Sequence, residues 1–177
     1  MAGAGGVWIA TTPLCPDGVG LSVTTPAPSR DASPEIRPAE RADLLAVYRI
    51  EQSAFPQPWP FSAFEQYLGD PGFLVAVDDA VVGYVVADTI YKHGRRIGHI
   101  KDLAVHGDHR RDGVGARLLT QAIGILDAEG ASAVKLEVRE SNEGAIELYR
   151  EYGFEQRSAV PNYYSDDERA LVLVRDV

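Results

Sequence analysis

A helix-like apolar pattern between two strand-like ones, within residues 96–139, is the feature that most restricts how this chain can fold. Residues 96–105 and 133–139 are strand-like, and the second of these segments alternates apolar and polar side chains. Between them, residues 113–128 repeat apolar side chains at helical spacing. The apolar face of this helix comprises Val114, Leu118, Ala122, Ile125 and Leu126. A strand, a helix and a strand in this order predict two parallel strands joined by a right-handed crossover.

Comparable patterns flank this unit on both sides. In chain order, the other predicted elements are a strand at 35–37, helices at 39–55 and 62–68 separated by the loop Pro56–Pro60, strands at 73–77 and 81–91, a turn at 93–94, a helix at 143–152, and two closing strands that end at Arg175. This order predicts an α/β fold of the α+β mixed-sheet kind, with a central mixed β-sheet flanked by helices on both faces.

The first 33 residues differ from the rest in composition. They are rich in Gly, Pro, Thr and Ala and have no periodic apolar pattern, so they cannot bury enough surface to offset the entropy of ordering. We therefore expect residues 1–33 to form a flexible extension and residues 34–177 to form one folded domain. This size suits a single hydrophobic core.

Composition excludes several classes of function and location. The net charge of −9 argues against nucleic-acid binding, which needs clustered Lys and Arg. Cys15 is the only cysteine, which favours a reducing compartment. No Lys or Arg precedes Arg30, and the longest early apolar run is Val7–Ala10, so neither a signal peptide nor a membrane span is expected. These features predict a cytoplasmic protein without a membrane partner.

Two arginines and two glycines occupy the loop where the strand 96–105 leads into the helix 113–128. Gly113 and Gly115 allow an anion to approach the backbone closely, and the N–H groups at a helix N-terminus attract phosphate. Arg110 and Arg111 can add charge-assisted contacts. The loop lacks the Gly-Lys-Ser/Thr ending of a nucleoside-triphosphate loop. Taken alone, such a loop is equally consistent with a simple tight turn.

The surroundings of the loop resemble the acetyl-CoA-binding motif of the GNAT superfamily of N-acetyltransferases. The motif is written Q/R-x-x-G-x-G/A, and Arg110, Gly113 and Gly115 match it in register. The resemblance implies that loop amides hold the pyrophosphate of CoA and that the end of the preceding strand pairs with the pantetheine arm. The residues to which it assigns these roles are Leu103, Ala104 and Val105 on the strand and Arg110, Arg111, Asp112, Gly113, Val114, Gly115 and Ala116 in the loop.

A second segment points to one branch of that superfamily. Residues 136–154 read LEVRESNEGAIELYREYGF and resemble the LEVR-x-SN-x-x-A-x-x-LY-x-x-x-GF pattern of N-terminal acetyltransferases, of the ribosomal-protein-alanine (RimI) type and its archaeal relatives. Tyr163 and Tyr164 belong to an N-Y-Y sequence found at the corresponding place in that branch. The resemblance spans residues 36–174.

The resemblance assigns catalytic roles to two residues of this segment. Glu137 is the implied proton acceptor, although a carboxylate on the polar face of a strand is ordinarily just solvated. An α-amine has a pKa of about 7.7–8.0, so a modest base suffices. Tyr149 is the implied proton donor to the departing CoA thiolate, and its alternative is an ordinary core tyrosine. Asn142 is implied to contact CoA and, from its position, also suits a helix N-cap.

Other candidate residues are less firmly assigned. His99 resembles a histidine of archaeal members that helps deprotonation through water, and a neutral strand histidine is an equal alternative. The acceptor is expected to enter between the loop Pro56–Pro60 and the segment around Tyr163 and Tyr164. Trp59 and the two tyrosines either grip a peptide or simply cap the core.

The implied function is transfer of acetyl from acetyl-CoA to the N-terminal amine of a protein, either the alanine of a ribosomal protein, as in the RimI type, or a broader set of N-termini. Two rivals remain open. The same catalyst could act on a small-molecule amine or a lysine side chain, or the chain could be a CoA-binding regulator without catalysis. Retention of Glu137, Asn142 and Tyr149 argues against the regulator. No His, Cys and carboxylate cluster has metal-ligand spacing, so no metal is expected.

Overall fold

The computed structural model describes residues 33–92 and 94–177. The predicted extension, apart from Ser33, lies outside the described residues, as do Cys15 and the His93 half of the predicted turn. The expectations for these segments therefore stay predictions.

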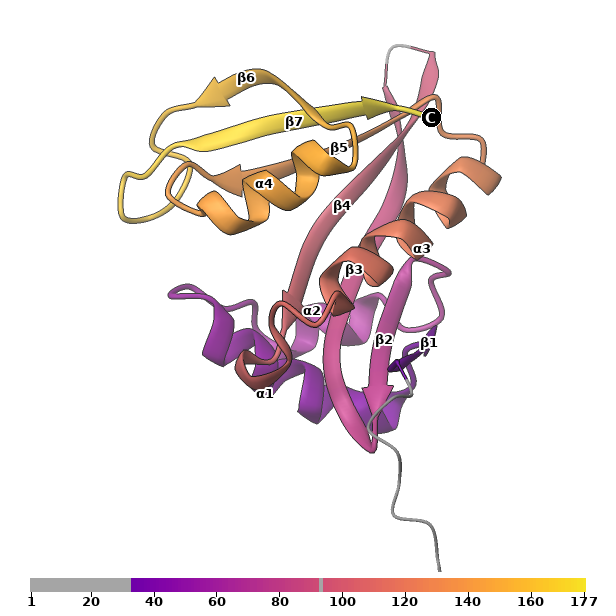
Figure 1. Cartoon of the computed structure of the whole chain (residues 1–177). Coiled ribbons are helices and arrows are strands. Elements are labelled where there is room, and N and C mark those ends of the chain that lie inside the picture. The colour runs from indigo at the N-terminus through magenta and orange to yellow at the C-terminus, as the bar shows by residue number, and fades with distance from the viewer. Residues whose placement is uncertain (1–32, 93) are drawn as a thin grey trace, which may run out of the picture. The chain divides into compact units, whose positions relative to one another are not determined.

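Within the described residues, seven strands form one mixed sheet in the order β1-β2-β3-β4-β5-β7-β6 (Figure 1). The strands are β1 Glu35–Pro38, β2 Phe73–Asp78, β3 Ala80–Lys92, β4 Arg95–Val105, β5 Ala133–Arg139, β6 Glu155–Val160 and β7 Ala170–Asp176. The helices are α1 Leu44–Ala54, α2 Phe61–Gln66, α3 Val114–Ala128 and α4 Glu143–Glu151, with short 3-10 turns at Arg41–Asp43 and Gly107–His109. The predicted fold class and element order are confirmed.

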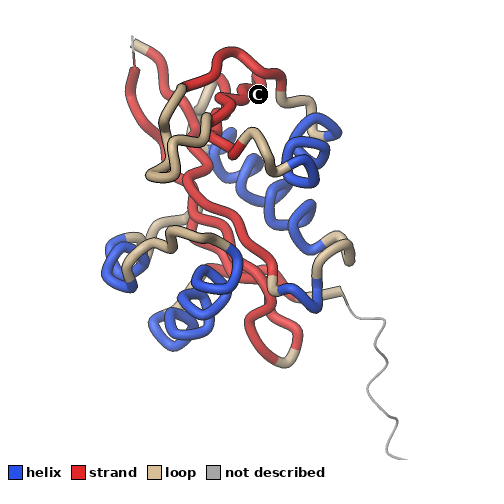
Figure 2. Tube along the Cα trace, turned by 90° about the vertical axis from the view of Figure 1, so that its left-hand side faces the viewer, coloured by secondary structure: helices blue, strands red, loops and turns tan. Residues whose placement is uncertain are grey.

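The sheet lies between two layers of helices, as Figure 2 shows from the side. Apolar side chains of α3 and α4 pack with one face of the sheet around Leu118, Leu126 and Leu136. Those of α1 and α2 pack with the other face around Phe64 and Tyr84. Each face thus has its own core, because each buries the apolar stripe of a different pair of helices.

The first helix begins later than its apolar pattern predicts. The pattern extends from residue 39, but α1 starts at Leu44 after a 3-10 turn. Asp43 is the physical reason: its carboxylate accepts hydrogen bonds from the Arg37 guanidinium at 2.7 and 2.9 Å and from the Glu40 backbone N–H at 2.8 Å. These bonds satisfy groups at the start of the helix and tie it to β1.

Strands β4 and β5 are parallel, as the crossover predicts, but they pair over a short distance only. The pairs run from Gly98 with Val134 to Ile100 with Leu136, and beyond them the two strands separate (Figure 1). Lys101 is an extra residue in β4, because Ile100 and Asp102 oppose adjacent residues of β3. Such a bulge bends a strand and changes which face its side chains reach. Leu103 accordingly packs with the α3 side, whereas Ala104 packs with the α1 side.

One glycine is required where the chain enters β2. A Cβ on Gly72 would lie 2.1 Å from the carbonyl oxygen of Ala87 on β3, whose N–H donates to Gly72 O at 3.0 Å. Because backbone cannot move aside cheaply, we expect Gly72→Ala to lower the free energy of unfolding by about 1–3 kcal/mol. Gly124→Ala is the matched control: Gly124 is an exposed α3 residue, and a Cβ added there would have no atom within 4 Å, so a gain of up to about 1 kcal/mol is expected. Urea unfolding of both variants measures the difference, and equal midpoints would contradict it.

No helix among residues 33–92 and 94–177 has the length and apolarity that crossing a bilayer requires.

Candidate active site

Three polar side chains lie together on the face of the sheet that carries α1, at the end of the stretch where β4 and β5 pair. His99 on β4 is the register partner of Lys135 on β5, and Glu137 lies two residues further along β5. Glu137 Oε2 is 2.7 Å from His99 Nε2, and Glu137 Oε1 accepts a hydrogen bond from Lys135 Nζ at 2.7 Å. The structure therefore brings Glu137 and His99 into contact, although they are 38 positions apart in the chain.

The charge state of Glu137 follows from these contacts. Partial burial alone would raise its pKa, but the hydrogen bonds from His99 and Lys135 outweigh burial and lower the pKa to about 2. At neutral pH the carboxylate can only accept, so His99 Nε2 is the donor of their bond. In the neutral imidazole Nδ1 then carries the lone pair, and within the described part of the chain no hydrogen bond involves Nδ1. His99 is thus the group of this pair with an available basic atom.

Tyr149 extends from α4, which covers the other face of the sheet. Its side chain is buried, and its ring meets that of Phe154 edge-on at 5.8 Å between centroids. Burial is the main cause that raises the pKa of the Tyr149 phenol, and an ionised Asp102 or Tyr164 would raise it further. The phenol therefore keeps its proton across the neutral range and can donate it.

The arginine–glycine loop presents unpaired backbone donors. Arg111 and Gly113 both have left-handed backbone, with φ of 70° and 77°, and Gly113 is the N-cap of α3. Within the described residues, none of the N–H groups from Arg111 to Ala116 donates a hydrogen bond. The Arg110 Nε donates to Val105 O at 3.3 Å, which ties the loop to the end of β4. Free amides at a helix N-terminus can bind a diphosphate group.

The end of β4 and the start of α4 border this loop. Leu103, Ala104 and Val105 lie beyond the last β4–β5 pair, so their edge of the strand toward β5 is not used for sheet pairing in the described structure. A Cβ on Gly115 would lie 3.6 Å from Val105 and 3.7 Å from Leu103, so the start of α3 packs closely on β4. Asn142 accepts a hydrogen bond from the Ala145 N–H at 3.3 Å, which confirms the predicted N-cap.

Aromatic residues flank the separated strands on the α1 side. The Trp59 ring packs on Phe64 at 5.7 Å and on Tyr67 at 5.9 Å, so the ring does cap the core, one of the two alternatives above. Tyr163 is half exposed and meets Tyr164 edge-on at 5.0 Å. A peptide contact by any of these rings stays a prediction.

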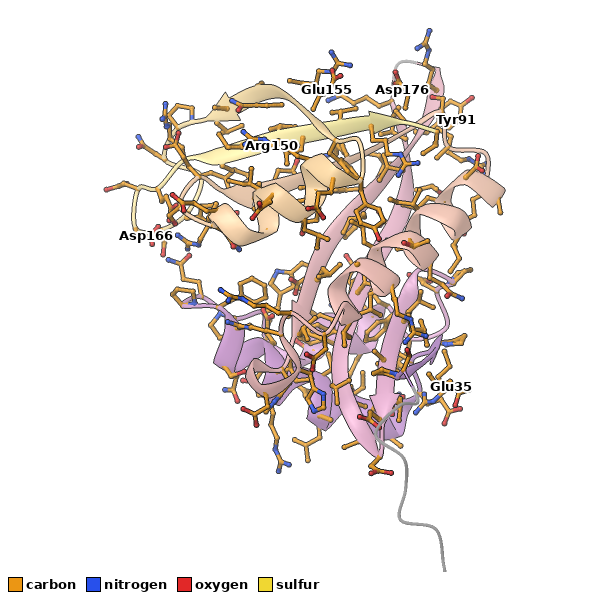
Figure 3. The ribbon with its side chains drawn as sticks, viewed as in Figure 1. Glu35, Tyr91, Arg150, Glu155, Asp166 and Asp176 are labelled. Atoms are coloured by element: carbon orange, nitrogen blue, oxygen red, sulfur yellow. The ribbon has the colours of Figure 1, made fainter. Side chains whose placement is uncertain are left out.

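The two loops around these rings are tied to each other and to β5. The Ser165 N–H donates to Gln57 Oε1 at 3.3 Å, which links the β6–β7 loop to the loop after α1. Arg139 lies 3.8 Å from the centroid of the Tyr164 ring and pairs with Asp166 at 2.8 Å and Glu168 at 2.6 Å. Figure 3 shows Asp166 at the outer end of the β6–β7 loop. The Tyr164 phenol, with its pKa raised to about 12 chiefly by burial, is held in place by these contacts.

Sequence reasoning missed a buried polar group next to these residues. The Tyr84 hydroxyl lies between the carboxyl groups of Glu51 and Asp102. The helical spacing could have indicated that Glu51 is buried, because Glu51 follows Leu44 and Val47 on the same face of α1. Among the described residues, no group of three or more His, Cys, Asp or Glu side chains is arranged to hold a metal ion.

Comparison with known proteins gives consistent matches. A family model described as the acetyltransferase (GNAT) family matches residues 44–154. The chain is 34% identical over 151 residues to an N-alpha-acetyltransferase of Sulfolobus acidocaldarius, covering 78% of this chain and 90% of that relative. It is 32% identical over 127 residues to the ribosomal protein bS18-alanine N-acetyltransferase of Escherichia coli, covering 71% of this chain and 83% of the relative.

Solved structures resemble the described domain closely. Ard1 from Thermoplasma volcanium matches with a TM-score of 0.75 and 32% identity, over 82% of this chain and 99% of that one. Naa50 of Arabidopsis thaliana, solved with the bisubstrate analogue CoA-Ac-MVNAL, matches with a TM-score of 0.74 over 82% of this chain and 100% of that one. The second match is 21% identical and therefore concerns the fold.

Proposed function

Because the chain belongs to the acetyltransferase (GNAT) family, in the branch of N-terminal protein acetyltransferases, we propose that it transfers acetyl from acetyl-CoA to a protein's N-terminal α-amine through His99, Glu137 and Tyr149. The observation that carries this proposal is the His99–Glu137 pair, joined at 2.7 Å where β4 and β5 separate. This pair lies on the α1 side of the sheet, as do the loops proposed to admit a peptide.

In the proposed transfer, His99 and Glu137 act together on the proton-accepting side. An α-ammonium must lose a proton before its nitrogen can attack, and His99 Nδ1 has the free lone pair. Glu137, ionised at neutral pH, orients the imidazole and stabilises the imidazolium that forms. The role of proton acceptor, which the resemblance assigns to Glu137, is thereby refined into that of a partner of His99.

Bond making and breaking then proceed without a covalent enzyme intermediate. The amine nitrogen forms the C–N bond, the thioester C–S bond breaks, and the sulfur takes the proton of Tyr149. The oxyanion of the tetrahedral intermediate would be held by backbone N–H groups at the end of β4, near Leu103. The nitrogen loses its second proton as the tetrahedral intermediate collapses to the amide, and the phenolate left on Tyr149 recovers a proton. Of the two protons that the ammonium loses, one is thus balanced by the new S–H bond of CoA and one is released to solvent.

The acetyl-CoA site is proposed along β4 and the loop that follows it. Leu103, Ala104 and Val105 would pair with the pantetheine arm, and the amides of residues 110–116 would hold the pyrophosphate. Asn142, at the start of α4, would contact CoA in addition to capping its helix. The free N–H groups and left-handed backbone of the loop support this assignment.

Gly113→Val is expected to weaken acetyl-CoA binding by tenfold or more, roughly 1.4 kcal/mol. A β-branched residue is strained at φ of 77°, so the loop would give up the backbone conformation that gathers its amides. Gly107→Val is the control, because Gly107 has no left-handed φ and no atom within 4 Å of an added Cβ. Calorimetric titration with acetyl-CoA measures both affinities. An intact Gly113→Val protein with unchanged affinity would refute the loop assignment.

The acceptor itself can be identified with a panel. Peptides with a free N-terminus, beginning with alanine, serine or methionine, are compared with N-terminally blocked peptides that contain lysine and with small amines. The N-terminus of a ribosomal protein is included, since one relative is named for ribosomal protein bS18. Turnover confined to free α-amines is the expected result. Turnover of blocked lysine peptides or of small amines would instead favour the rival acceptors.

A further inference from the structure

Two buried carboxyl groups lie between α1 and the sheet and have no role in the transfer as proposed so far. Glu51 on α1 is 1% exposed, and Asp102 on β4 is 9% exposed. The hydroxyl oxygen of Tyr84 lies 2.5 Å from Glu51 Oε2 and 2.8 Å from Asp102 Oδ2. The other oxygen of Glu51, Oε1, accepts the Trp59 N–H at 2.6 Å. One hydrogen-bonded chain thus connects the loop after α1 to β4.

The hydrogen-bonded chain formed by Glu51, Tyr84 and Asp102 must contain a carboxyl proton in addition to the Tyr84 O–H. Tyr84 has a single O–H, which it can donate to one carboxyl only. The second carboxyl can bond to the phenol oxygen only by donating, and for that it must be a carboxylic acid. Two unpaired charges buried this close would also be strongly disfavoured. The pair therefore carries one negative charge.

Hydrogen bonding assigns that charge to Glu51. Its carboxylate accepts from both the Trp59 N–H and the Tyr84 O–H, and bonds of this kind favour the ionised form. Burial first, then the charge of Glu51, raise the pKa of Asp102 well above its ordinary value, while the contacts with the Tyr84 hydroxyl and the Leu103 backbone oppose this only in part. Asp102 is accordingly the acid that donates to Tyr84.

Asp102, the neutral end of the hydrogen-bonded chain, lies on β4 next to the segment proposed to bind acetyl-CoA. Asp102 is two residues beyond Ile100, the last β4 residue paired with β5, and directly precedes Leu103. The titratable groups that act on it come from α1 and β3, through Glu51 and Tyr84. A charge on Asp102 would in turn raise the pKa of Tyr149 on α4, in the same direction as Tyr164 does.

We propose that Asp102 is a positioning residue for the transfer: held as a neutral acid by Tyr84 and Glu51, it keeps the separated part of β4 uncharged beside Tyr149. Tyr149 becomes a phenolate when it protonates the departing sulfur, and a neighbouring carboxylate would oppose that charge. This inference rests on the proposed function, and specifically on Tyr149 as the proton donor.

Two isosteric variants differ in which residue holds the negative charge, and both keep the hydrogen-bonded chain. In Asp102→Asn, the new amide donates to Tyr84, Tyr84 donates to Glu51, and the charge stays on Glu51. In Glu51→Gln, Trp59 N–H fixes the amide oxygen, so the amide N–H₂ faces Tyr84. Tyr84 then donates to Asp102, which takes the charge. Both variants keep every hydrogen bond and one negative charge.

Steady-state kinetics with a free-N-terminus peptide distinguishes the two variants. We expect Asp102→Asn to keep kcat within about twofold of the wild type and Glu51→Gln to lower it about tenfold or more, with little change in KM for acetyl-CoA. Thermal unfolding of both variants is the control for stability. Equal kcat values for two folded variants would overturn the inference while leaving the proposed function intact. A wild-type enzyme without peptide turnover would instead count against the proposed function.

A measurement on the wild-type protein does not depend on whether Glu51→Gln folds. In protein labelled with ¹³C at the aspartate carboxyl carbon, Asp102→Asn identifies the Asp102 signal by its loss. We expect that signal at the position of a protonated carboxyl at pH 7. A signal at the ionised position would overturn the assignment of the proton, and with it the inference.

Discussion

Glu137→Gln is expected to lower kcat/KM by about 10²-fold for an alanine- or serine-starting peptide at pH 7, the low end of the range for general acid–base catalysis. Glutamine can still accept the His99 Nε2–H, so the tautomer survives, but the charge that stabilises the imidazolium is lost. The low end is expected because an α-amine, with a pKa of about 7.7–8.0, is already partly neutral near pH 7. Glu155→Gln, on the exposed edge strand β6 (Figure 3), is the matched control without effect.

The size of the Glu137→Gln defect is expected to depend on pH. The pKa of Glu137 is lowered to about 2, so the carboxylate stays ionised from pH 6 to 9 and its own titration does not shape the profile. Activity should therefore rise with pH as the α-amine loses its proton. The defect of Glu137→Gln should shrink at high pH, because free amine then forms without help. A wild-type profile across pH 6–9 would leave Glu137 a structural carboxylate and assign the base role to His99 alone.

A double substitution tests whether His99 and Glu137 act as one unit. His99→Gln is expected to cost at least as much as Glu137→Gln, because it removes the basic nitrogen itself. Residues that act together are not additive, so the double variant should be little worse than His99→Gln. Additive losses would mean that the two residues work independently, despite the 2.7 Å between them.

Tyr149→Phe should lower kcat by about 10²-fold and leave KM for acetyl-CoA nearly unchanged. The phenylalanine ring keeps the packing on Phe154, so the change removes only the proton donor. Since burial is the main cause of the raised pKa of Tyr149, the phenol remains protonated from pH 6 to 9 and the defect should persist over that range. This behaviour contrasts with that of Glu137→Gln, whose defect shrinks as pH rises.

Tyr152→Phe provides the control for Tyr149→Phe. Tyr152 is the C-cap residue of the same helix, only partly buried, and has no part in the proposed transfer. Single-turnover measurements with saturating acetyl-CoA isolate the chemical step for both variants. If Tyr149→Phe transfers acetyl as fast as Tyr152→Phe, Tyr149 is a core residue, and the proposal for Asp102 loses its basis.

Much of the fold and part of the site follow from local sequence patterns. The strand Ala133–Arg139 has the bounds that its alternation predicts, and α3 begins within one residue of its expected start. The left-handed Gly113 is where the glycine loop predicts a special backbone. These features depend on the period of apolar residues and on what one residue's backbone can adopt, and both can be read along the chain. Motif register also singled out His99, Glu137 and Tyr149, whose catalytic roles stay proposals.

Tertiary structure decided how those residues meet. Nothing in the local pattern indicates that β7 lies between β5 and β6, or that β4 and β5 part after Ile100. The extra residue Lys101 is visible only when β4 is set against β3. Strand register and bulges arise from pairing between distant segments, so they appear only in the assembled sheet.

The charges of the site depend on the same long-range contacts. By itself, the sequence determined which ionisable groups the chain has, Glu51, Asp102 and Glu137 among them, and on which element each lies. The fold decided that Glu137 meets two hydrogen-bond donors and stays ionised, whereas Asp102 is buried against Glu51 and Tyr84 and keeps its proton. The physical reason is that a carboxyl's pKa is set by burial and by the donors and charges around it, and these neighbours come from other parts of the chain.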